Sequence, residues 1–371
     1  MRPAFVSESL PPMDVAGRLG RLRDHLDAAG CDALVVTKLE NVRYLTGFTG
    51  SAGMLLVAPD RALLLTDGRY RDQAAAELAA AGVAAELEIA GVAGQLEALG
   101  RAAAGAGRVG LEARSVTWAL ERRLEEQFEG STLVPTLGVV EALRQVKDEG
   151  EVARIEAACD VADVAIAQVK PMLASGCTEA EFATELEAEM RRRGSSGAAF
   201  ETIVASGPNS AMPHARPSSR AIGPGELVVL DFGATVEGYR SDMTRTVCLG
   251  EPPPDLVALV DAVFAAQRAG LRAVAEGVAA SEVDRACREA LADAGLADAF
   301  SHSTGHGVGL EIHEAPAVSK DSTDILRAGA VVTVEPGAYL AGRGGVRIED
   351  TVLVGRSGAR ALTKSTKDYT L

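Results

Sequence analysis

The stretch Leu227–Cys248, LVVLDFGATVEGYRSDMTRTVC, contains the residues that decide the fold and chemistry of the second half of this chain. Residues 227–236 and 239–248 are rich in β-branched and apolar side chains, which favours strands. Glu237 and Gly238 stand between them, and a two-residue connection ending in glycine is typical of a tight hairpin turn. The sequence therefore predicts an antiparallel β-hairpin.

Two aspartates lie on one face of this predicted hairpin. With a two-residue turn, Asp231 lies opposite Thr244, and Asp242 lies two residues along on the same face. Diagonal neighbours on one face are about 7–8 Å apart, so their side chains can converge on ions between them. A single Asp here would ordinarily be a solvated strand or turn residue. Two of them among valines and leucines imply buried carboxylates, which need a partner or a cation.

A second pair of carboxylates occurs near the C-terminus. Glu335 ends the apolar run AVVTV and precedes Pro336-Gly337, which should stop that strand, and Glu349 lies within the apparent strand VRIEDTVLV. A buried glutamate costs free energy unless it binds something positive. Arg347 is two residues from Glu349 and should face the same side. It can form an ordinary Arg–Glu pair within the strand, or orient the carboxylate as a metal ligand.

Histidine is scarce, since the chain has only five, and four of them lie near these segments. The fifth, His25, lies in a predicted amphipathic helix over residues 14–30 and should be a surface residue. A single histidine is often purely structural, but clustering beside carboxylates favours a role in the site. The four are His214, His302, His306 and His313.

Together these segments predict a cage for two metal ions. An oxygen-rich site with one nitrogen ligand suits hard or borderline divalent ions such as Mn²⁺ better than a thiolate-type zinc site. Two such ions roughly 3.5–4 Å apart can hydrolyse an amide bond. The predicted ligands are Asp231, Asp242, His306, Glu335 and Glu349.

The motifs resemble those of a known family. The chain is similar to the Xaa-Pro peptidases of the pita-bread metallopeptidases, the group that contains aminopeptidase P and prolidase. The N-terminal half contributes ENVRYLTGFTGSAG (40–53) and TDGRYRDQA (66–74), which look most like the shorter bacterial aminopeptidase P members. The second half contributes FETIVASGPNSAMPHA (200–215), the hairpin, HSTGHGVGLEIHE (302–314), VTVEPG (332–337) and GGVRIEDTVLV (344–354).

The resemblance implies a role for each site residue. Asp231 would hold one ion, His306 and Glu335 the other, and Asp242 and Glu349 would bridge both. Glu335 would also move the proton of the attacking water. His214 and His313 would hydrogen-bond the substrate and the tetrahedral intermediate. His302 would help to shape the proline-side pocket or hold the carboxyl-side atoms of the substrate. The implied cofactors are two divalent ions, with Mn²⁺ preferred over Co²⁺ or Zn²⁺.

The implied activity is removal of an N-terminal residue linked to proline from peptides. The alternative within the family is a prolidase that cleaves only Xaa-Pro dipeptides, and a homodimer is expected in either case. Three other readings stay open: a metal-free enzyme of the creatinase type, a catalytically silent binding module, and a methionine aminopeptidase. The intact ligand set argues against the first two, and the N-terminal domain argues against the third.

Composition and charge restrict the binding partners and the cellular compartment that we expect for this protein. A net charge of −15 and a pI near 4.9 make nucleic-acid binding through a basic face unexpected. The five cysteines are scattered without a CxxC pair, which favours reduced thiols. The first residues, MRPAFVSESLPPM, lack the apolar core of a signal peptide, and no apolar run is long enough for a membrane span. We therefore expect a cytoplasmic protein that does not associate with membranes.

The order of predicted elements indicates two domains. Strand-like runs at 31–37, 52–59, 61–67, 85–91 and 108–112 alternate with helices near 70–81, 92–103 and 115–128. This alternation predicts an α/β domain of the creatinase N-terminal type over 14–143. A long helix from about 148 and helices near 178–193, 254–275 and 281–294 separate the strands that follow. That half, residues 148–371, is predicted to be an α+β catalytic domain of the pita-bread type.

Overall fold

The computed structural model describes residues 10–370. The chain divides into two compact units, one formed by Met13–Arg144 and the other by the remaining residues. Among the described residues, each unit has hydrophobic clusters of its own, such as that around Leu56 and Leu99 in the N-terminal unit and those around Val263 and Leu186 in the C-terminal unit.

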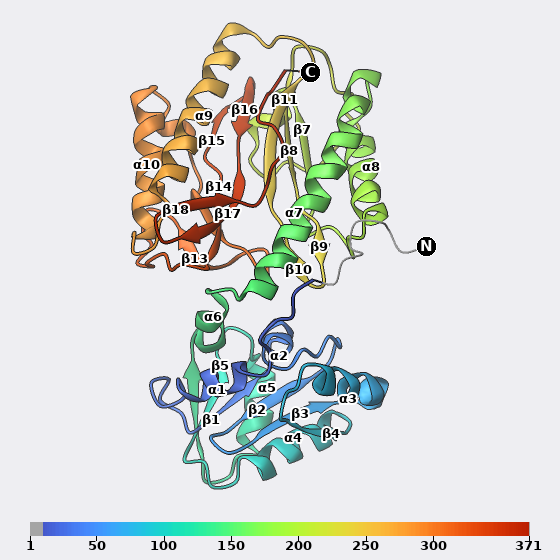
Figure 1. The fold of residues 1–371 in the computed structure, drawn as a ribbon, viewed down its shortest axis with the longest axis vertical. Helices are drawn as coiled ribbons and strands as arrows, with labels where there is room; N and C mark the ends of the chain where they lie inside the picture. Colours follow the sequence, from blue (N-terminus) through green and yellow to red (C-terminus); the bar gives the residue numbers. More distant parts are fainter. Residues whose placement is uncertain (1–9, 371) are drawn as a thin grey trace. The chain divides into compact units, whose positions relative to one another are not determined.

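The N-terminal unit is built on a six-stranded sheet with the order β4-β3-β2-β1-β5-β6 (Figure 1). β2 pairs antiparallel with β1 and β3, and the remaining neighbours are parallel. Three of the four interior strands, β1, β2 and β3, are buried along their whole length, which explains their runs of leucine and valine. The strands are β1 (Ala33–Val36), β2 (Met54–Val57), β3 (Ala62–Thr66), β4 (Glu86–Ile89), β5 (Arg108–Glu112) and β6 (Thr132–Thr136).

The helices of this unit agree with most of the predictions. Those near 70–81, 92–103 and 115–128 are confirmed as α3, α4 and α5, whereas α2, α6 and β6 were not predicted. The expected helix over 14–30 is wrong in length: α1 is short, and turns lead from it to Gly30, which has φ +73°. His25 is exposed, as predicted. The helices are α1 (Arg18–Arg23), α2 (Leu39–Thr46), α3 (Arg71–Ala80), α4 (Val92–Ala102), α5 (Trp118–Glu125) and α6 (Val139–Arg144).

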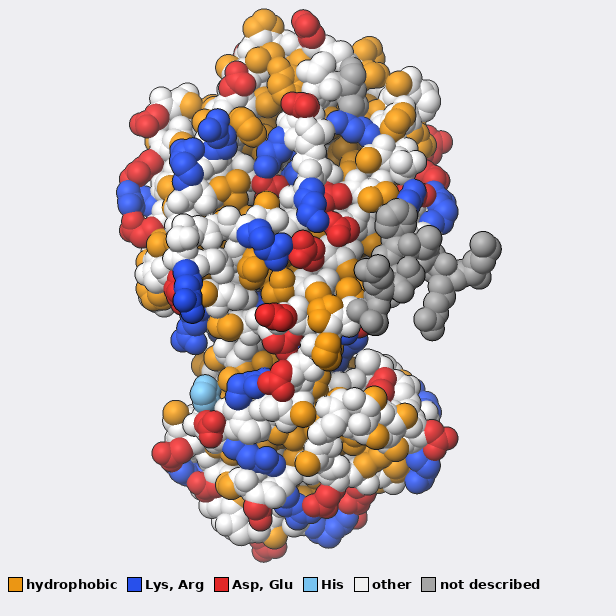
Figure 2. Space-filling model, viewed as in Figure 1, with side chains coloured by type: hydrophobic (Ala, Val, Ile, Leu, Met, Phe, Trp, Pro, Cys, Tyr) orange, Lys and Arg blue, Asp and Glu red, His pale blue; other side chains and the backbone are white. Residues whose placement is uncertain are grey.

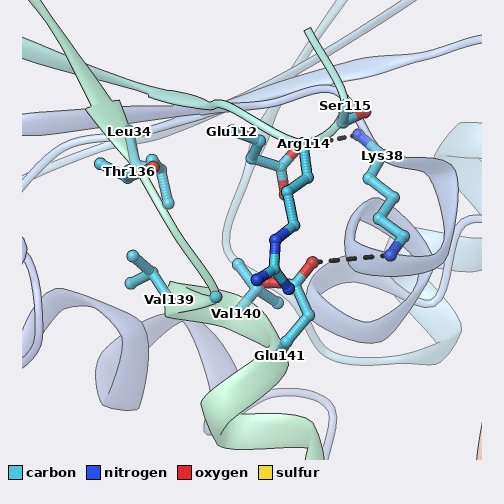
Figure 3. A pocket seen from close by; sticks show the side chains of 10 residues that line it. Leu34, Lys38, Glu112, Arg114, Ser115, Thr136, Val139, Val140 and Glu141 are labelled. Atoms are coloured by element: carbon cyan, nitrogen blue, oxygen red, sulfur yellow. Dashed lines mark hydrogen bonds and ion pairs between the residues drawn. The ribbon is translucent and has the colours of Figure 1, made fainter. Parts of the chain in front are cut away.

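A buried carboxylate explains why α2 begins where it does. Glu112, at the end of β5, accepts hydrogen bonds from the backbone N–H groups of Thr37 (2.6 Å) and Lys38 (2.8 Å). Lys38 also reaches Glu141, with 3.6 Å between Nζ and Oε1 (Figure 3). Lys38, Glu112 and Glu141 are among the residues that line a small cavity of about 120 Å³ in the N-terminal unit. Glu112 thus satisfies the backbone N–H of Lys38, the residue directly before α2, which has no side-chain cap of its own.

The C-terminal unit contains the four longer helices that the sequence predicts. Asp148 and Thr178 each form a reciprocal capping box with a glutamate three residues on, which fixes the starts of α7 and α8. Figure 1 shows α7 and α8 on one side of the strands of this unit and α9 and α10 on the other. The helices are α7 (Glu149–Val169), α8 (Glu179–Arg192), α9 (Pro254–Ala273) and α10 (Ala280–Asp293).

Two helix-and-sheet halves make up this unit, as the repeated element order predicts. One cluster packs α7 and α8 on the sheet β11-β8-β7, and the other packs α9 and α10 on strands that include β14, β16 and β17. The larger sheet has the order β13-β12-β14-β17-β18. The strands are β7 (Ile203–Ser206), β8 (Leu227–Phe232), β9 (Thr235–Val236), β10 (Tyr239–Arg240), β11 (Met243–Cys248), β12 (Gly305–Gly307), β13 (Glu314–Val318), β14 (Val331–Val334), β15 (Gly337–Leu340), β16 (Gly344–Arg347), β17 (Asp350–Gly355) and β18 (Gly358–Ala361).

The hairpin has the predicted register but not continuous strands. Asp231 pairs with Thr244, and Val236 pairs with Tyr239 across the turn. Each arm is broken, so that β8 and β9 form one arm and β10 and β11 the other. A side chain at Gly233 would meet the carbonyl oxygen of Ser241, because the two arms approach closely at this break.

The strand predicted around Glu349 is also interrupted. The structure places Glu349 between β16 and β17, not inside one strand. Its backbone N–H donates to the carbonyl of Thr244 (3.1 Å), so the break brings this segment against the hairpin. The other prediction for this region is confirmed, since β14 ends at Val334, immediately before Glu335.

Charged groups of both signs are interspersed over the face of the molecule seen in Figure 2. In residues 10–370, each helix is too short or too polar to cross a membrane.

Candidate metal centre

The five predicted ligands come from strand ends and from the breaks between strands, where the backbone can turn a side chain out of the regular ladder. Four of the five are carboxylates, and both arms of the hairpin contribute one. Asp231 lies in β8, Asp242 directly before β11, His306 in β12, Glu335 directly after β14, and Glu349 between β16 and β17.

The structure brings these five side chains together. Asp231, Asp242 and Glu349 each offer a carboxylate oxygen, and these atoms all lie within 4.8 Å of one another. His306 Nε2 lies 3.5 Å from Asp242 Oδ2 and 3.4 Å from Glu335 Oε1. Asp242 is therefore shared between the aspartate–glutamate side and the histidine–glutamate side of one centre.

The donor set fits divalent cations. Asp231 Oδ1 and Glu349 Oε1 are buried and accept no hydrogen bond from any described residue. Burial, followed by the charges of Glu349, Asp231 and Glu335, raises the pKa of Asp242 well above its ordinary value. Burial likewise raises the pKa of Glu335 to about 8 and that of Glu349 well above its usual range. Cations among these carboxylates would offset both their burial and their mutual repulsion.

His306 is prepared to act as a ligand. Its Nδ1 lies 3.0 Å from the carbonyl oxygen of Gly307, and a carbonyl can only accept, so Nδ1 carries the proton. The lone pair of Nε2 is then free to face the carboxylates. Burial, and next the neighbouring His313, lower the pKa of His306 to about 4. The ring is thus neutral near pH 7, which is the form that binds metals.

Arg347 does not form the predicted pair with Glu349. Its Nη2 donates to Asp231 Oδ2 (2.6 Å) and its Nε to Thr244 Oγ1 (3.1 Å). Thr244 in turn donates to Glu349 Oε2 (2.7 Å), so Arg347 reaches that carboxylate only through the threonine. The alternation of side chains in a strand placed Arg347 correctly on the site side. It could not identify the partner, which belongs to a strand distant in sequence.

The remaining predicted residues surround a cavity of about 770 Å³. The rings of His306 and His313 meet edge to face, with centroids 4.3 Å apart. His302 Nε2 lies 2.9 Å from the hydroxyl of Tyr339, and burial, then Arg347, lower the pKa of His302 to about 4. Glu349 belongs to the carboxylate cluster, and the other site residues line the cavity: Asp231, Asp242, Glu335, His306, His313, His214, His302 and Arg347.

Two residues of the site were not predicted as functional. Tyr339, in β15, accepts a hydrogen bond from Arg347 Nη1 (2.8 Å) and contacts His302, so it connects two predicted residues. No local pattern singles out this tyrosine. Thr244 bonds both Arg347 and Glu349, and its place opposite Asp231 was the available signal.

A centre of four carboxylates and one imidazole, held between two helix-and-sheet halves, is that of a metal-dependent hydrolase. The chain belongs to metallopeptidase family M24, whose model matches residues 153–356. The creatinase/prolidase N-terminal domain matches residues 18–146. The protein is thus a hydrolase of peptide bonds. The predicted resemblance to the Xaa-Pro peptidases and the predicted combination of a creatinase-type N-terminal domain with a pita-bread domain are confirmed.

Similar proteins cover nearly the whole chain. Uncharacterized peptidase YqhT of Bacillus subtilis is 39% identical over 351 residues, which are 95% of this chain and 99% of that protein. The solved Xaa-Pro dipeptidase from Bacillus anthracis superposes with a TM-score of 0.92 at 37% identity, covering 96% of this chain and 100% of its own. The X-Pro aminopeptidase from Thermotoga maritima gives 0.86 at 35% identity, covering 95% and 100%.

Proposed function

We propose that this protein is a dinuclear-metal aminopeptidase that hydrolyses the bond between an N-terminal residue and a following proline. The observation that carries the proposal is the convergence of Asp231, Asp242, Glu349, His306 and Glu335 beside a cavity of about 770 Å³. That volume lies within the usual range of small-ligand sites. We assign the catalytic domain to residues 148–371 and the accessory domain to 14–143, and expect a cytoplasmic homodimer.

The chain's own residues have distinct roles in the proposed reaction. The five ligands would hold two divalent ions, with Mn²⁺ preferred because oxygen donors dominate. Bound there, the ions would polarise the scissile carbonyl and acidify water. Glu335 would accept the proton of the attacking water and pass it to the proline nitrogen. His214 and His313 would donate hydrogen bonds to the oxygen that gains negative charge.

Charge around the cavity favours an aminopeptidase over a strict dipeptidase. An enzyme restricted to dipeptides must recognise the terminal carboxylate of the proline, for which a positioned cation is the usual partner. Among the described lining residues, Arg347 and Arg216 are the only Lys or Arg side chains. Arg347 is engaged by Asp231, and Arg216 is 80% exposed and paired with Glu201 at 3.1 Å. A site in which no described lining Lys or Arg is free to bind the terminal carboxylate of a dipeptide suits longer peptides better.

A prolidase is the second candidate, and the similarity to the Bacillus anthracis dipeptidase favours it. Arg216 would then have to leave Glu201 to bind the substrate carboxylate. The two candidates predict different substrate preferences from the same metal centre.

The test uses purified protein that has been stripped with chelator and reconstituted with Mn²⁺. Hydrolysis of Gly-Pro, of a tripeptide Xaa-Pro-Xaa and of Met-Ala-Ser is then compared. We expect the tripeptide to be cleaved as well as or better than Gly-Pro. Cleavage of the dipeptide alone would establish a prolidase, and preference for Met-Ala-Ser a methionine aminopeptidase. If none of the three peptides is cleaved in the presence of Mn²⁺, the proposal is wrong, and a metal-free enzyme of the creatinase type or a catalytically silent binding module is favoured.

The role of His313 gives a separate prediction. His313→Ala should lower kcat by roughly a hundred-fold, the usual effect of losing one preorganised donor at an oxyanion. Metal content, measured by elemental analysis, should stay near two ions per chain, because the ring packs against His306 without replacing it as a ligand. His25→Ala, an exposed histidine in the N-terminal unit, is the control. Loss of metal together with activity would instead make His313 a ligand.

A further inference from the structure

A buried glutamate outside the metal centre holds the loop that carries His214. Glu179, the first residue of α8, is fully buried and has no part in the reaction proposed above. The first part of the connection between β7 and β8, residues 206–218, is here called the 206–218 loop. It leaves the sheet at Ser206, passes through the 3₁₀ turn Gly207–Ala211, and carries His214 into the lining of the cavity.

Both ends of this loop bind the same carboxylate. At the start of the loop, Ser206 donates to Glu179 Oε1 from its backbone N–H and from its hydroxyl, each at 2.7 Å. At the far end, Ser218 donates to Oε2 from its backbone N–H (3.0 Å) and its hydroxyl (2.6 Å). Asn209 adds a contact of 3.1 Å to each oxygen. One side chain thus sets the separation between the two ends.

The helix beneath gives this carboxylate a fixed position. The backbone N–H groups of Glu179 and Ala180 donate to the carbonyls of Arg220 and Ser218, both at 3.0 Å, so the far end of the loop also caps α8. Burial alone would raise the pKa of Glu179, but the hydrogen bonds from Ser218 and Ser206 outweigh it and lower the pKa below its ordinary value. The carboxylate is therefore charged, and its hydrogen bonds are of the stronger, charge-assisted kind.

His214 depends on this loop for its position. The side chain is exposed and makes no hydrogen bond within the described part of the chain. Two other contacts hold the middle of the loop: Arg347 Nη1 donates to the carbonyl of Pro213 (3.1 Å), and the N–H of Gly345 donates to Ser210 Oγ (2.8 Å). Arg220 also bonds both serines, from its Nη1 to Ser206 Oγ (2.7 Å) and from its backbone N–H to Ser218 Oγ (3.1 Å). Glu179 binds the backbone N–H and the hydroxyl of each serine through one side chain.

We infer that Glu179 is a positioning residue for the reaction: by binding both ends of the 206–218 loop, it sets where His214 stands over the metal centre. The inference rests on the role proposed for His214. A shift of about 1 Å in a catalytic group can cost roughly a hundred-fold in rate. The effect of Glu179 should therefore be seen in kinetics.

Glu179→Gln is the decisive variant, because it is nearly isosteric but turns one accepting oxygen into an NH₂ group that cannot accept from a serine. We expect kcat/KM to fall by roughly 10- to 100-fold with metal content close to wild type. The melting temperature should fall as well, because one buried backbone N–H loses its acceptor. Glu181→Gln is the matched control: it lies two residues along the same helix start, where its side chain bonds only Thr178. That variant should retain normal kcat/KM.

A double-mutant cycle separates positioning from general damage. In a His214→Ala background, Glu179→Gln should cost less than about three-fold more, because the group that it positions is already gone. If the loss of kcat/KM in the double variant equals the product of the losses in the two single variants, Glu179 acts independently of His214. That result would overturn the inference.

A second measurement does not depend on activity. The chain has only five histidines, so ¹³C-histidine NMR of the enzyme loaded with diamagnetic Zn²⁺ can follow each ring, and His214→Ala assigns one signal. Glu179→Gln should move or broaden the His214 signal and leave that of His25 unchanged. An unchanged His214 signal would refute the positioning role. A moved signal with normal activity in His214→Ala would instead refute only the function proposed for His214.

If Glu179→Gln does not fold, Ser218→Ala decides the same question. It removes one donor at the far end of the loop and should move the His214 signal in the same direction by a smaller amount. No movement in this folded variant would equally refute the inference.

Discussion

Replacing either central carboxylate, by Asp242→Ala or Glu349→Ala, should abolish peptidase activity while leaving the fold intact. Asp242 lies close to Asp231, Glu349 and His306, and Glu349 has a buried oxygen that accepts no hydrogen bond from a described residue. Losing a shared ligand should remove several kcal/mol of transition-state stabilisation. At about 1.4 kcal/mol per factor of ten, kcat/KM should fall at least roughly a thousand-fold.

Metal content and stability distinguish this loss from unfolding. Metal bound per chain should drop in both variants, whereas the melting temperature in chelator should not fall below that of wild type. The reason is that each change removes one buried negative charge from a cluster whose carboxylates repel one another. Asp321→Ala, at an exposed position in the same unit, is the control. Normal turnover in either site variant would refute the proposed metal cage.

Arg347→Met should damage both stability and catalysis. Arg347 is 3% exposed and donates to Asp231, Thr244, Tyr339 and the carbonyl of Pro213. Removing one partner of a buried ion pair typically costs about 3–5 kcal/mol. Loss of a residue that orients a ligand typically lowers metal affinity or activity about 10- to 100-fold. We expect both effects, measured by denaturant unfolding and by kcat/KM at saturating Mn²⁺.

Arg216→Met provides the comparison for stability. Arg216 lines the same cavity, but it is exposed and its pair with Glu201 is solvated, so its loss should change the free energy of unfolding by less than about 1 kcal/mol. If Arg347→Met is no less stable than Arg216→Met, the Arg347–Asp231 pair does not stabilise the site as described. The prediction for Arg347 would then be wrong.

Arg347 and Glu179 illustrate how the site depends on residues that have no direct part in the proposed reaction but hold other residues in position. Arg347 orients Asp231 and contacts Pro213, next to His214. Glu179 binds the two ends of the same loop. The backbone around His214 is thus held from two directions, as the role that we propose for this exposed residue requires.

Features that depend on local pattern could be predicted from the amino-acid sequence. The two-residue turn set the hairpin register, so the pairing of Asp231 with Thr244 could be predicted. The alternation of strand-like runs with helix-forming runs located the four long helices of the C-terminal unit and most elements of the N-terminal unit. The candidate ligands could also be recognised from the sequence. Four of the five are carboxylates among apolar residues, and a buried carboxylate costs free energy unless a positive charge compensates it.

Contacts between groups distant in sequence could not be predicted and became visible in the folded protein. The pairing of Arg347 with Asp231 instead of Glu349, the place of Tyr339 between Arg347 and His302, and the binding of both loop ends by Glu179 join segments far apart in the chain. The break in the strand at Glu349 belongs with them, because that segment bonds the hairpin. Side-chain alternation fixes the face on which a residue lies, but its partner on that face is set by the packing of the two halves.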